Sequence, residues 1–185
     1  MKATGIVRRI DDLGRVVIPK EIRRTMRIRE GDPLEIYTDR EGEVIFKKYS
    51  PIGELSSFAA QYADTLYKTC NMAVLISDRD AVIASAGVSR KEYADKPLSD
   101  ELEAVIEGRS MYVWREGGEQ YAPTADSTSH YVSCAMPIIS EGDVVGCVAS
   151  LTERGADRIK EGISGEMESK LILTAAGFLG RQLET

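Results

Sequence analysis

Alternating apolar and polar positions divide the first fifty residues into four short strands and one short helix. Residues 4–10 and 15–18 are rich in apolar and β-branched side chains, and they predict two strands joined by a turn in which Gly14 adopts a positive φ. Pro19 ends the second strand because it lacks a backbone N–H, and it suits the start of a helix over residues 20–27. Further alternating strands are predicted at residues 34–38 and 44–49.

A unit of this size buries little apolar area, and chains so small have almost no net stability by themselves. The pattern therefore predicts that two copies pair, interleave their strands and share one core. Such a twofold unit presents each of its side chains twice.

The remaining residues have the pattern of an α+β domain. Apolar positions recur at helical spacing over residues 54–69 and again over residues 163–179, which predicts a helix at each end. Ser99 begins a third helix, whose first turn is acidic, as the positive end of the helix dipole favours. Strands are predicted at residues 72–76, 81–86, 111–114, 131–138 and 144–151. The sequence thus predicts an antiparallel sheet with flanking helices.

The strand pattern of the first part breaks at the run SPIG, residues 50–53. Proline and glycine in this run favour a boundary. The sequence therefore predicts a first domain over residues 1–50, a linker at residues 51–53 and a second domain over residues 54–185.

Charge is distributed unevenly between these parts. The whole chain has 24 basic and 30 acidic residues, a net charge of −6. Residues 1–29 nonetheless hold nine basic and three acidic residues, a net +6, whereas residues 51–185 hold twelve basic and twenty-one acidic residues, a net −9. A basic head on an acidic body is the charge layout of a small nucleic-acid-binding protein. The alternative is that these charges cluster by chance on a solvated surface. Only the placement of the basic residues in the structure distinguishes the two explanations.

Composition argues against several classes of protein. No apolar run approaches the roughly 20 residues that cross a membrane, and the N-terminal residues lack the pattern of a secretory signal. Three widely spaced cysteines fit a reducing cytoplasm rather than a disulfide scaffold, and a single histidine leaves little material for a metal site. With no cofactor signature either, the sequence predicts a cytoplasmic protein without a membrane span, cofactor or metal.

The residue strings of the first domain resemble one known family. They read TGIVRR at 4–9, DLGRVVIP at 12–19, EIRR at 21–24, LEIY at 34–37 and FKKY at 46–49. These strings are similar to those of the AbrB (transition-state regulator) family, and the match covers about the first fifty residues. The resemblance implies an all-β swapped-hairpin barrel with a short helix, which forms a homodimer and binds double-stranded DNA.

The family's motif also implies which side chains contact DNA. They map onto Arg8, Arg15, Arg23 and Arg24, with Arg9, Lys20 and Arg27 as flanking candidates for phosphate contacts. Arginine suits this role because its planar guanidinium pairs with two acceptors of a phosphate or a guanine at once. From the residues alone, the alternative is that these arginines form surface ion pairs with Asp11, Asp12 and Glu21. Lys47 and Lys48 are expected on the far face of the last strand.

The second domain resembles a GAF domain in the order of its elements and in the run VVGCVAS at residues 144–150. With both domains, the chain resembles the sporulation regulators of the AbrB family, which implies regulation of genes of the developing spore, as activator or repressor. The first and last helices of this domain are expected to lie together and to assemble the chain into a homotetramer. Ordinary packing of these helices onto the sheet is the alternative.

A polar loop at residues 115–130 is long enough to cover a ligand site. Trp114, Tyr121, Tyr131 and Cys134 are the candidate lining residues for an unidentified small-molecule effector. A core tryptophan beside an irregular loop explains the same residues equally well.

The sequence thus predicts a DNA-binding transcriptional regulator that is not an enzyme, and two other functions are the alternatives. A thiol-based GAF-like reductase would use Cys134 and Cys147 on adjacent predicted strands, but both lie in apolar runs without a basic neighbour. An antitoxin of a toxin–antitoxin pair would share the swapped-hairpin head, but it would end in a flexible tail rather than in a structured domain.

Overall fold

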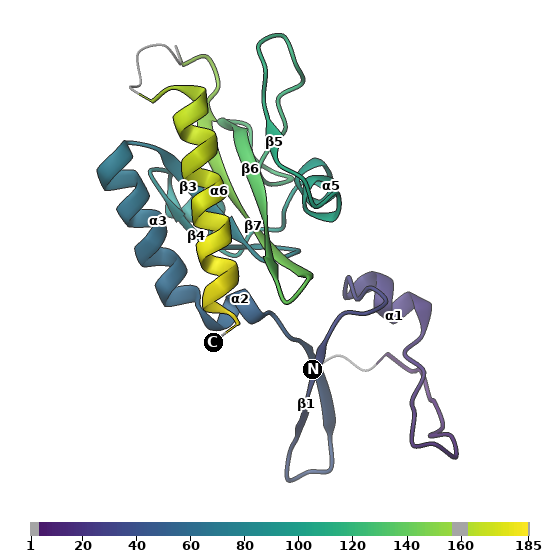
Figure 1. The fold of residues 1–185 in the computed structure, drawn as a ribbon. Helices are drawn as coiled ribbons and strands as arrows, with labels where there is room; N and C mark the ends of the chain where they lie inside the picture. The colour runs from purple at the N-terminus through teal and green to yellow at the C-terminus, as the bar shows by residue number, and fades with distance from the viewer. Residues whose placement is uncertain (1–3, 157–162, 185) are drawn as a thin grey trace. The chain divides into compact units, whose positions relative to one another are not determined.

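The computed structural model describes residues 4–156 and 163–184. The chain divides into two compact units, Met1–Tyr49 and Ser50–Thr185, which we call the first unit and the second unit. Each unit has a sheet of its own, and Figure 1 shows the elements of both.

The first unit contains one short helix and one two-stranded sheet. Helix α1 spans Lys20–Thr25 after Pro19, and the antiparallel strands are β1, Leu34–Thr38, and β2, Val44–Lys48. The strands pair in register from Leu34 opposite Lys48 to Thr38 opposite Val44. The predicted helix 20–27 ends two residues early, because the backbone turns at Arg27, whose φ is +52°.

The two strands predicted at residues 4–10 and 15–18 are not formed in the described chain. The turn between them does form, since the Asp11 N–H donates to the Arg15 carbonyl at 3.0 Å. A strand needs a hydrogen-bonded neighbour, and within one chain these segments pair with none of the described strands. Their apolar side chains lie open, with Val7 86% exposed and Val17 72% exposed.

None of the described apolar residues among residues 4–49 is buried. Even the paired strands leave Ile36 61% and Phe46 44% exposed. The first unit therefore has apolar side chains in the expected alternation but, as a single chain, no core in which to place them.

The second unit is built on a five-stranded antiparallel sheet in the order β4-β3-β7-β6-β5. Its elements in chain order are α2 (Pro51–Glu54), α3 (Ser56–Cys70), β3 (Ala73–Ser77), β4 (Val82–Ala86), α4 (Arg90–Tyr93), α5 (Asp100–Glu107), β5 (Tyr112–Val113), β6 (His130–Ser140), β7 (Asp143–Glu153) and α6 (Gly165–Gln182). The predicted helices and strands of this domain are present, β6 and β7 are longer than predicted, and the short helix α4 was not predicted.

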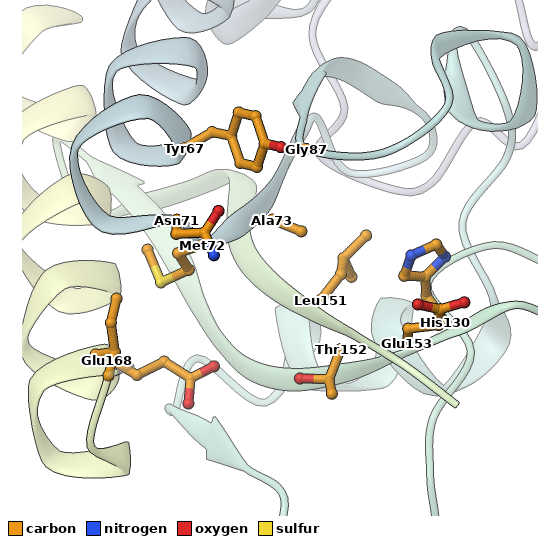
Figure 2. Close-up of a pocket in the computed structure, with 11 residues that line it drawn as sticks. Tyr67, Asn71, Met72, Ala73, Gly87, His130, Leu151, Thr152, Glu153 and Glu168 are labelled. Carbon is orange, nitrogen blue, oxygen red and sulfur yellow. The ribbon is translucent and has the colours of Figure 1, made fainter. Parts of the chain in front are cut away.

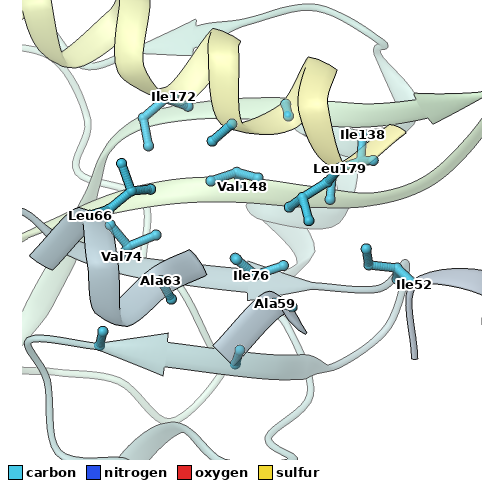
Figure 3. Close-up of a cluster of buried hydrophobic side chains, with 14 of the residues drawn as sticks. Ile52, Ala59, Ala63, Leu66, Val74, Ile76, Ile138, Val148, Ile172 and Leu179 are labelled. Carbon is cyan, nitrogen blue, oxygen red and sulfur yellow. The ribbon is translucent and has the colours of Figure 1, made fainter. Parts of the chain in front are cut away.

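Helices α3 and α6 lie side by side over one face of this sheet (Figure 1). Between them and the sheet lies a first buried cluster, which includes Ala63 of α3, Val148 of β7 and Leu179 of α6 (Figure 3). Helices α4 and α5 cover the opposite face with a second cluster that includes Tyr93 and Leu102. The sheet is therefore covered on both faces, as its nearly continuous apolar strands require.

Close approach of the backbones explains two glycines of this unit. A Cβ at Gly146 would lie 2.0 Å from the Ser77 carbonyl oxygen, and a Cβ at Gly180 would lie 2.2 Å from that of Ile139. Glycine at these positions allows β7 to pair tightly with β3 and allows α6 to rest on β6.

The residues predicted as a linker, 51–53, instead belong to helix α2. The Ser50 hydroxyl accepts the Gly53 N–H at 3.2 Å, Pro51 occupies the first helical position, and Ile52 is fully buried in the first cluster. Only Tyr49 and Ser50 separate β2 from α2, and the Tyr49 N–H donates to the Pro33 carbonyl of the first unit at 3.0 Å. Each of the two residues is thus tied to one unit.

Among residues 4–156 and 163–184, no helix combines the length and the apolar character that crossing a bilayer requires.

Candidate nucleic-acid interface

The basic residues predicted to contact DNA are all exposed in the first unit. They fall into three local groups: Arg8 and Arg9 before the turn, Arg15 after it, and Lys20, Arg23, Arg24 and Arg27 on or just beyond α1. Arg23 and Arg24 occupy the last turn of α1, where positive charge is favourable against the helix dipole. The chain thus offers these cations to solvent rather than to its own core.

Arg15 is held at the end of a closed turn by one acidic side chain. Asp11 Oδ1 accepts the backbone N–H groups of Leu13 at 3.0 Å and of Arg15 at 2.8 Å, and Asp11 Oδ2 accepts Arg15 Nε at 2.7 Å. Gly14 completes the turn with φ of +76°. The hydrogen bonds from the Arg15 backbone and side chain, with that from Leu13, lower the pKa of Asp11 below its usual value. The alternative of a local ion pair is therefore realised for Arg15, in a geometry that leaves its side chain 68% exposed.

The end of α1 is fixed by a residue from the far strand. Lys48 Nζ donates to the Arg27 carbonyl at 2.8 Å and lies 3.8 Å from Asp32 Oδ2. Asp32 in turn accepts the Arg29 N–H at 2.7 Å. Lys48, expected only to decorate the strand, thus holds the segment that follows Arg23 and Arg24, whereas Lys47 lies over the Tyr37 ring at 4.4 Å. The alternating pattern of the strand gives no signal for this contact, because it joins residues 21 positions apart.

The four residues predicted to line an effector site have different surroundings, and only Trp114 and Tyr131 of the four are in ring contact with each other. The Trp114 ring lies 5.1 Å from that of Tyr131, and Tyr121 stacks on Tyr112 at 4.6 Å beside the second buried cluster. Cys134 is fully buried in the first cluster, under α3 and α6. Burial is also the main reason why the pKa of Tyr112 rises to about 12.

The loop predicted at residues 115–130 is irregular up to the start of β6, and a polar network ties it to the sheet. The Tyr93 hydroxyl lies 2.8 Å from Ser127 Oγ and 3.0 Å from His130 Nδ1. Trp114 Nε1 donates to the Gly118 carbonyl at 3.1 Å. Tyr93 is fully buried, and burial raises the pKa of its hydroxyl. These contacts tie the end of the loop to α4 and fold its start back on Trp114.

A pocket of about 200 Å³ lies elsewhere, where α3 ends and α6 begins (Figure 2). Its polar lining includes Asn71, His130, Thr152, Glu153 and Glu168, and its apolar lining includes Met72, Leu151 and Ile163. The Glu168 side chain is nearly buried, and Ser150 Oγ donates to its carboxyl oxygen at 2.6 Å. None of the four residues predicted for the effector lines this pocket.

The cysteines have the surroundings of inert core thiols. Cys134 and Cys147 are both fully buried, and burial raises the pKa of the Cys147 thiol far above its usual value. Thiolate formation, which nucleophilic chemistry needs, is therefore suppressed. The described residues also contain no cluster of three histidine, cysteine or acidic side chains that would hold a metal ion.

Comparison with known proteins covers both units. Residues 54–184 match the family described as stage V sporulation protein T C-terminal, transcription factor, and residues 7–53 match the family described as antidote-toxin recognition MazE, bacterial antitoxin. Stage V sporulation protein T of Bacillus subtilis is 52% identical over 187 residues, which cover 100% of this chain and 99% of that protein. The transition state regulatory protein AbrB of the same organism is 43% identical over 101 residues, covering 54% of this chain and 88% of that protein.

Among solved structures, the GAF domain of a phosphoenolpyruvate-protein phosphotransferase from Acinetobacter is similar over 70% of this chain and 81% of its own, with 12% identity and a TM-score of 0.51. At this identity the likeness concerns the fold alone. It confirms the GAF-like fold predicted for the second domain.

Proposed function

The chain belongs to the stage V sporulation protein T family of transcription factors, and from that premise we propose that it grips double-stranded DNA with the arginines of a dimeric first unit. The prediction of a DNA-binding transcriptional regulator of sporulation genes, with a GAF-like second domain, is thereby confirmed. The contact residues, the dimer and the effector are the parts that the proposal adds.

The observation that supports a dimer is the exposure of apolar side chains in the first unit of a single chain. Val7, Ile10 and Val17 are 86%, 69% and 72% exposed, although they lie in the two segments predicted as strands. Apolar side chains left open to water in this number gain nothing from the hydrophobic effect until another surface covers them. A second copy supplies both the missing strand neighbours and the missing core, since interleaved strands bury each other's apolar faces.

Dimerisation also doubles the basic surface. Arg8, Arg15, Arg23 and Arg24 of two chains bring eight guanidinium groups to one assembly, and Arg9, Lys20 and Arg27 flank them. Each neutralised phosphate releases counterions. In a plot of the logarithm of the DNA-binding constant against the logarithm of the salt concentration, eight contacts therefore give a negative slope of magnitude up to about 7.

We assign residues 1–50 to this DNA-binding domain and residues 54–185 to signal input or oligomerisation, with the intervening helix joining them.

The outer faces of α3 and α6 support self-association of the second unit. Phe58, Tyr62 and Phe178 form an aromatic cluster across the two helices, with ring centroids 5.6–6.3 Å apart, and Phe178 is 41% exposed. Met167 and Leu173 on α6 are 54% and 48% exposed. Pairing of these faces would join two dimers into a homotetramer in the cytoplasm. For an unidentified effector, we favour the pocket at the end of α3 over the surroundings of Trp114, Tyr121, Tyr131 and Cys134, because Cys134 is fully buried in the first cluster.

The test uses the full chain and a labelled mixed-sequence duplex. Arg15→Ala and Arg24→Ala are each expected to weaken binding at least about tenfold, as loss of a charged contact does. Both variants should retain the assembly state of the parent in light scattering, because the side chains are exposed. Unchanged binding in both variants would remove these arginines from the DNA contact.

The antitoxin alternative retains one specific observation, the match of residues 7–53 to the antitoxin family. The whole-chain likeness to a sporulation protein and the structured second unit oppose it. Co-purification of a small basic protein in a fixed stoichiometry would favour the antitoxin.

A further inference from the structure

One carboxylate of the first unit divides its two oxygens between the backbone and a DNA-binding side chain. Asp11 Oδ1 accepts the N–H groups of Leu13 and Arg15 and so closes the turn, whereas Oδ2 accepts Arg15 Nε at 2.7 Å. Nε is the guanidinium nitrogen nearest the main chain. The bond therefore fixes the direction of the side chain and leaves the Nη1 and Nη2 groups at its outer end.

This ion pair contributes little to folding. The side chains of Arg15 and Asp11 are 68% and 36% exposed, and exposed pairs at this spacing add little stability in water. The effect of the contact therefore falls mainly on where the Arg15 guanidinium points.

We propose that Asp11 is a positioning residue for DNA binding, which holds Arg15 through Nε so that Nη1 and Nη2 face a phosphate or a base edge. The inference rests on the proposed DNA contact of Arg15. A long side chain loses rotamer freedom when it binds in one geometry, and a bond made beforehand removes part of that cost. The same carboxylate also repels phosphates, so Asp11 acts on affinity in two opposite ways.

The neighbouring Asp12 separates these two effects. It carries the same charge one residue away and is exposed, and no described hydrogen bond or ion pair joins it to Arg15. Asp12→Asn therefore removes the charge alone. Asp11→Asn removes the same charge and the charged partner of Nε, while its amide oxygen still accepts the backbone N–H groups of Leu13 and Arg15.

The experiment measures the dissociation constant of the full chain for a labelled mixed-sequence duplex, at several salt concentrations, for both asparagine variants. Asp12→Asn is expected to bind about twofold tighter at low salt, because less negative charge faces the phosphates. Asp11→Asn is expected to bind about fivefold more weakly than Asp12→Asn, since Arg15 is then ordered only on binding.

A double-mutant cycle identifies the side chain through which Asp11 acts. Arg15→Ala is expected to cost about fivefold less in the Asp11→Asn background than in the parent chain. Arg15→Lys removes the Nε donor of the contact and keeps the positive charge, because lysine has no Nε. In that background the two asparagine variants should change affinity alike, and a difference that persists there would come from the turn rather than from the contact with Nε.

The possible failures are distinguishable. Equal affinities of Asp11→Asn and Asp12→Asn, or an equal cost of Arg15→Ala in both backgrounds, overturn the positioning role and leave the DNA-binding surface intact. An Arg15→Ala variant that binds like the parent overturns the proposed Arg15 contact and the role of Asp11 together.

Discussion

The two units differ in what a single chain can complete. In the second unit, one sheet is covered on both faces, and side chains such as Leu75, Ile76 and Leu179 are fully buried. In the first unit, none of the described apolar residues is buried, although its strands alternate as a half-buried sheet requires. The comparison teaches that a strand pattern specifies which side chains need to be buried. It does not specify whether the same chain or a second chain covers them.

The largest expected effect tests the core of the second unit. Leu179→Ala is expected to lower the free energy of unfolding by about 3 kcal/mol, because it leaves a cavity under α6. The matched variant Leu173→Ala removes the same atoms from a side chain that is 48% exposed, and it should cost less than about 1 kcal/mol. Denaturant unfolding, followed through the fluorescence of Trp114, reports on this unit because the chain has one tryptophan. Equal losses in the two variants would contradict the assigned core.

The next effect tests whether the first unit finds its core in a partner. Val17→Asp changes a side chain that is 72% exposed in one chain, so it is harmless if the unit works as a monomer. If a second copy covers Val17, the buried charge is expected to weaken dimerisation of the first unit and DNA binding by more than about tenfold. Light scattering and fluorescence anisotropy of the full chain measure both. Val113→Asp, at a position 40% exposed on β5, is the control and should bind DNA normally.

A smaller effect is expected where β2 holds the end of α1. Lys48→Met removes the hydrogen bond to the Arg27 carbonyl and is expected to cost about 1 kcal/mol of stability in the first unit. Lys47→Met, on the same strand, removes a cation that lies over the Tyr37 ring and should cost less, because that contact is exposed. Hydrogen exchange of the amides around Arg27 compares the two. A larger effect from Lys47 would reverse the assigned roles.

The smallest expected effect is a loss of turn stability at acid pH. Hydrogen bonds lower the pKa of Asp11 below the usual 3.8, so its ionised form stabilises the turn. That contribution is fully present above the ordinary pKa of an aspartate and is lost as the pH falls through the lowered value. The amide signals of Leu13 and Arg15 should therefore shift in this acid range, and Asp11→Asn should abolish the transition. A transition that persists in the variant would assign it to another group.

The sequence predicted the helices and strands of the second unit well, because each pattern there is satisfied within the chain. Residues 4–10 and 15–18 show what a local residue pattern does not predict. Their β-branched runs predict strands, yet strand formation depends on a neighbour that the same chain does not provide. The run at 50–53 does lie at the boundary between the two units, as predicted. Residues 51–53 are nevertheless helical rather than a linker, because Ser50 caps the helix and Ile52 is buried.

Only those parts of the candidate site that lie within one short sequence motif were predictable. The exposed arginines follow from the motif of residues 4–24, and the turn at Gly14 was expected from the same string. The contact of Lys48 with the Arg27 carbonyl and the pocket at the end of α3 join residues far apart in the chain. No short pattern records such pairs. The chemistry of the side chains likewise gives no sign that Cys134 lies in the first cluster while the Trp114 ring contacts Tyr131.

The junction at Tyr49 and Ser50 has a mechanical consequence. Three virtual Cα–Cα bonds join Lys48 to Pro51, which span about 10 Å at full extension. Both intervening residues are already engaged, one by the Pro33 carbonyl and the other as the cap of α2. Whatever the orientation of the two units, the first residue of α2 therefore stays within about 10 Å of the end of β2.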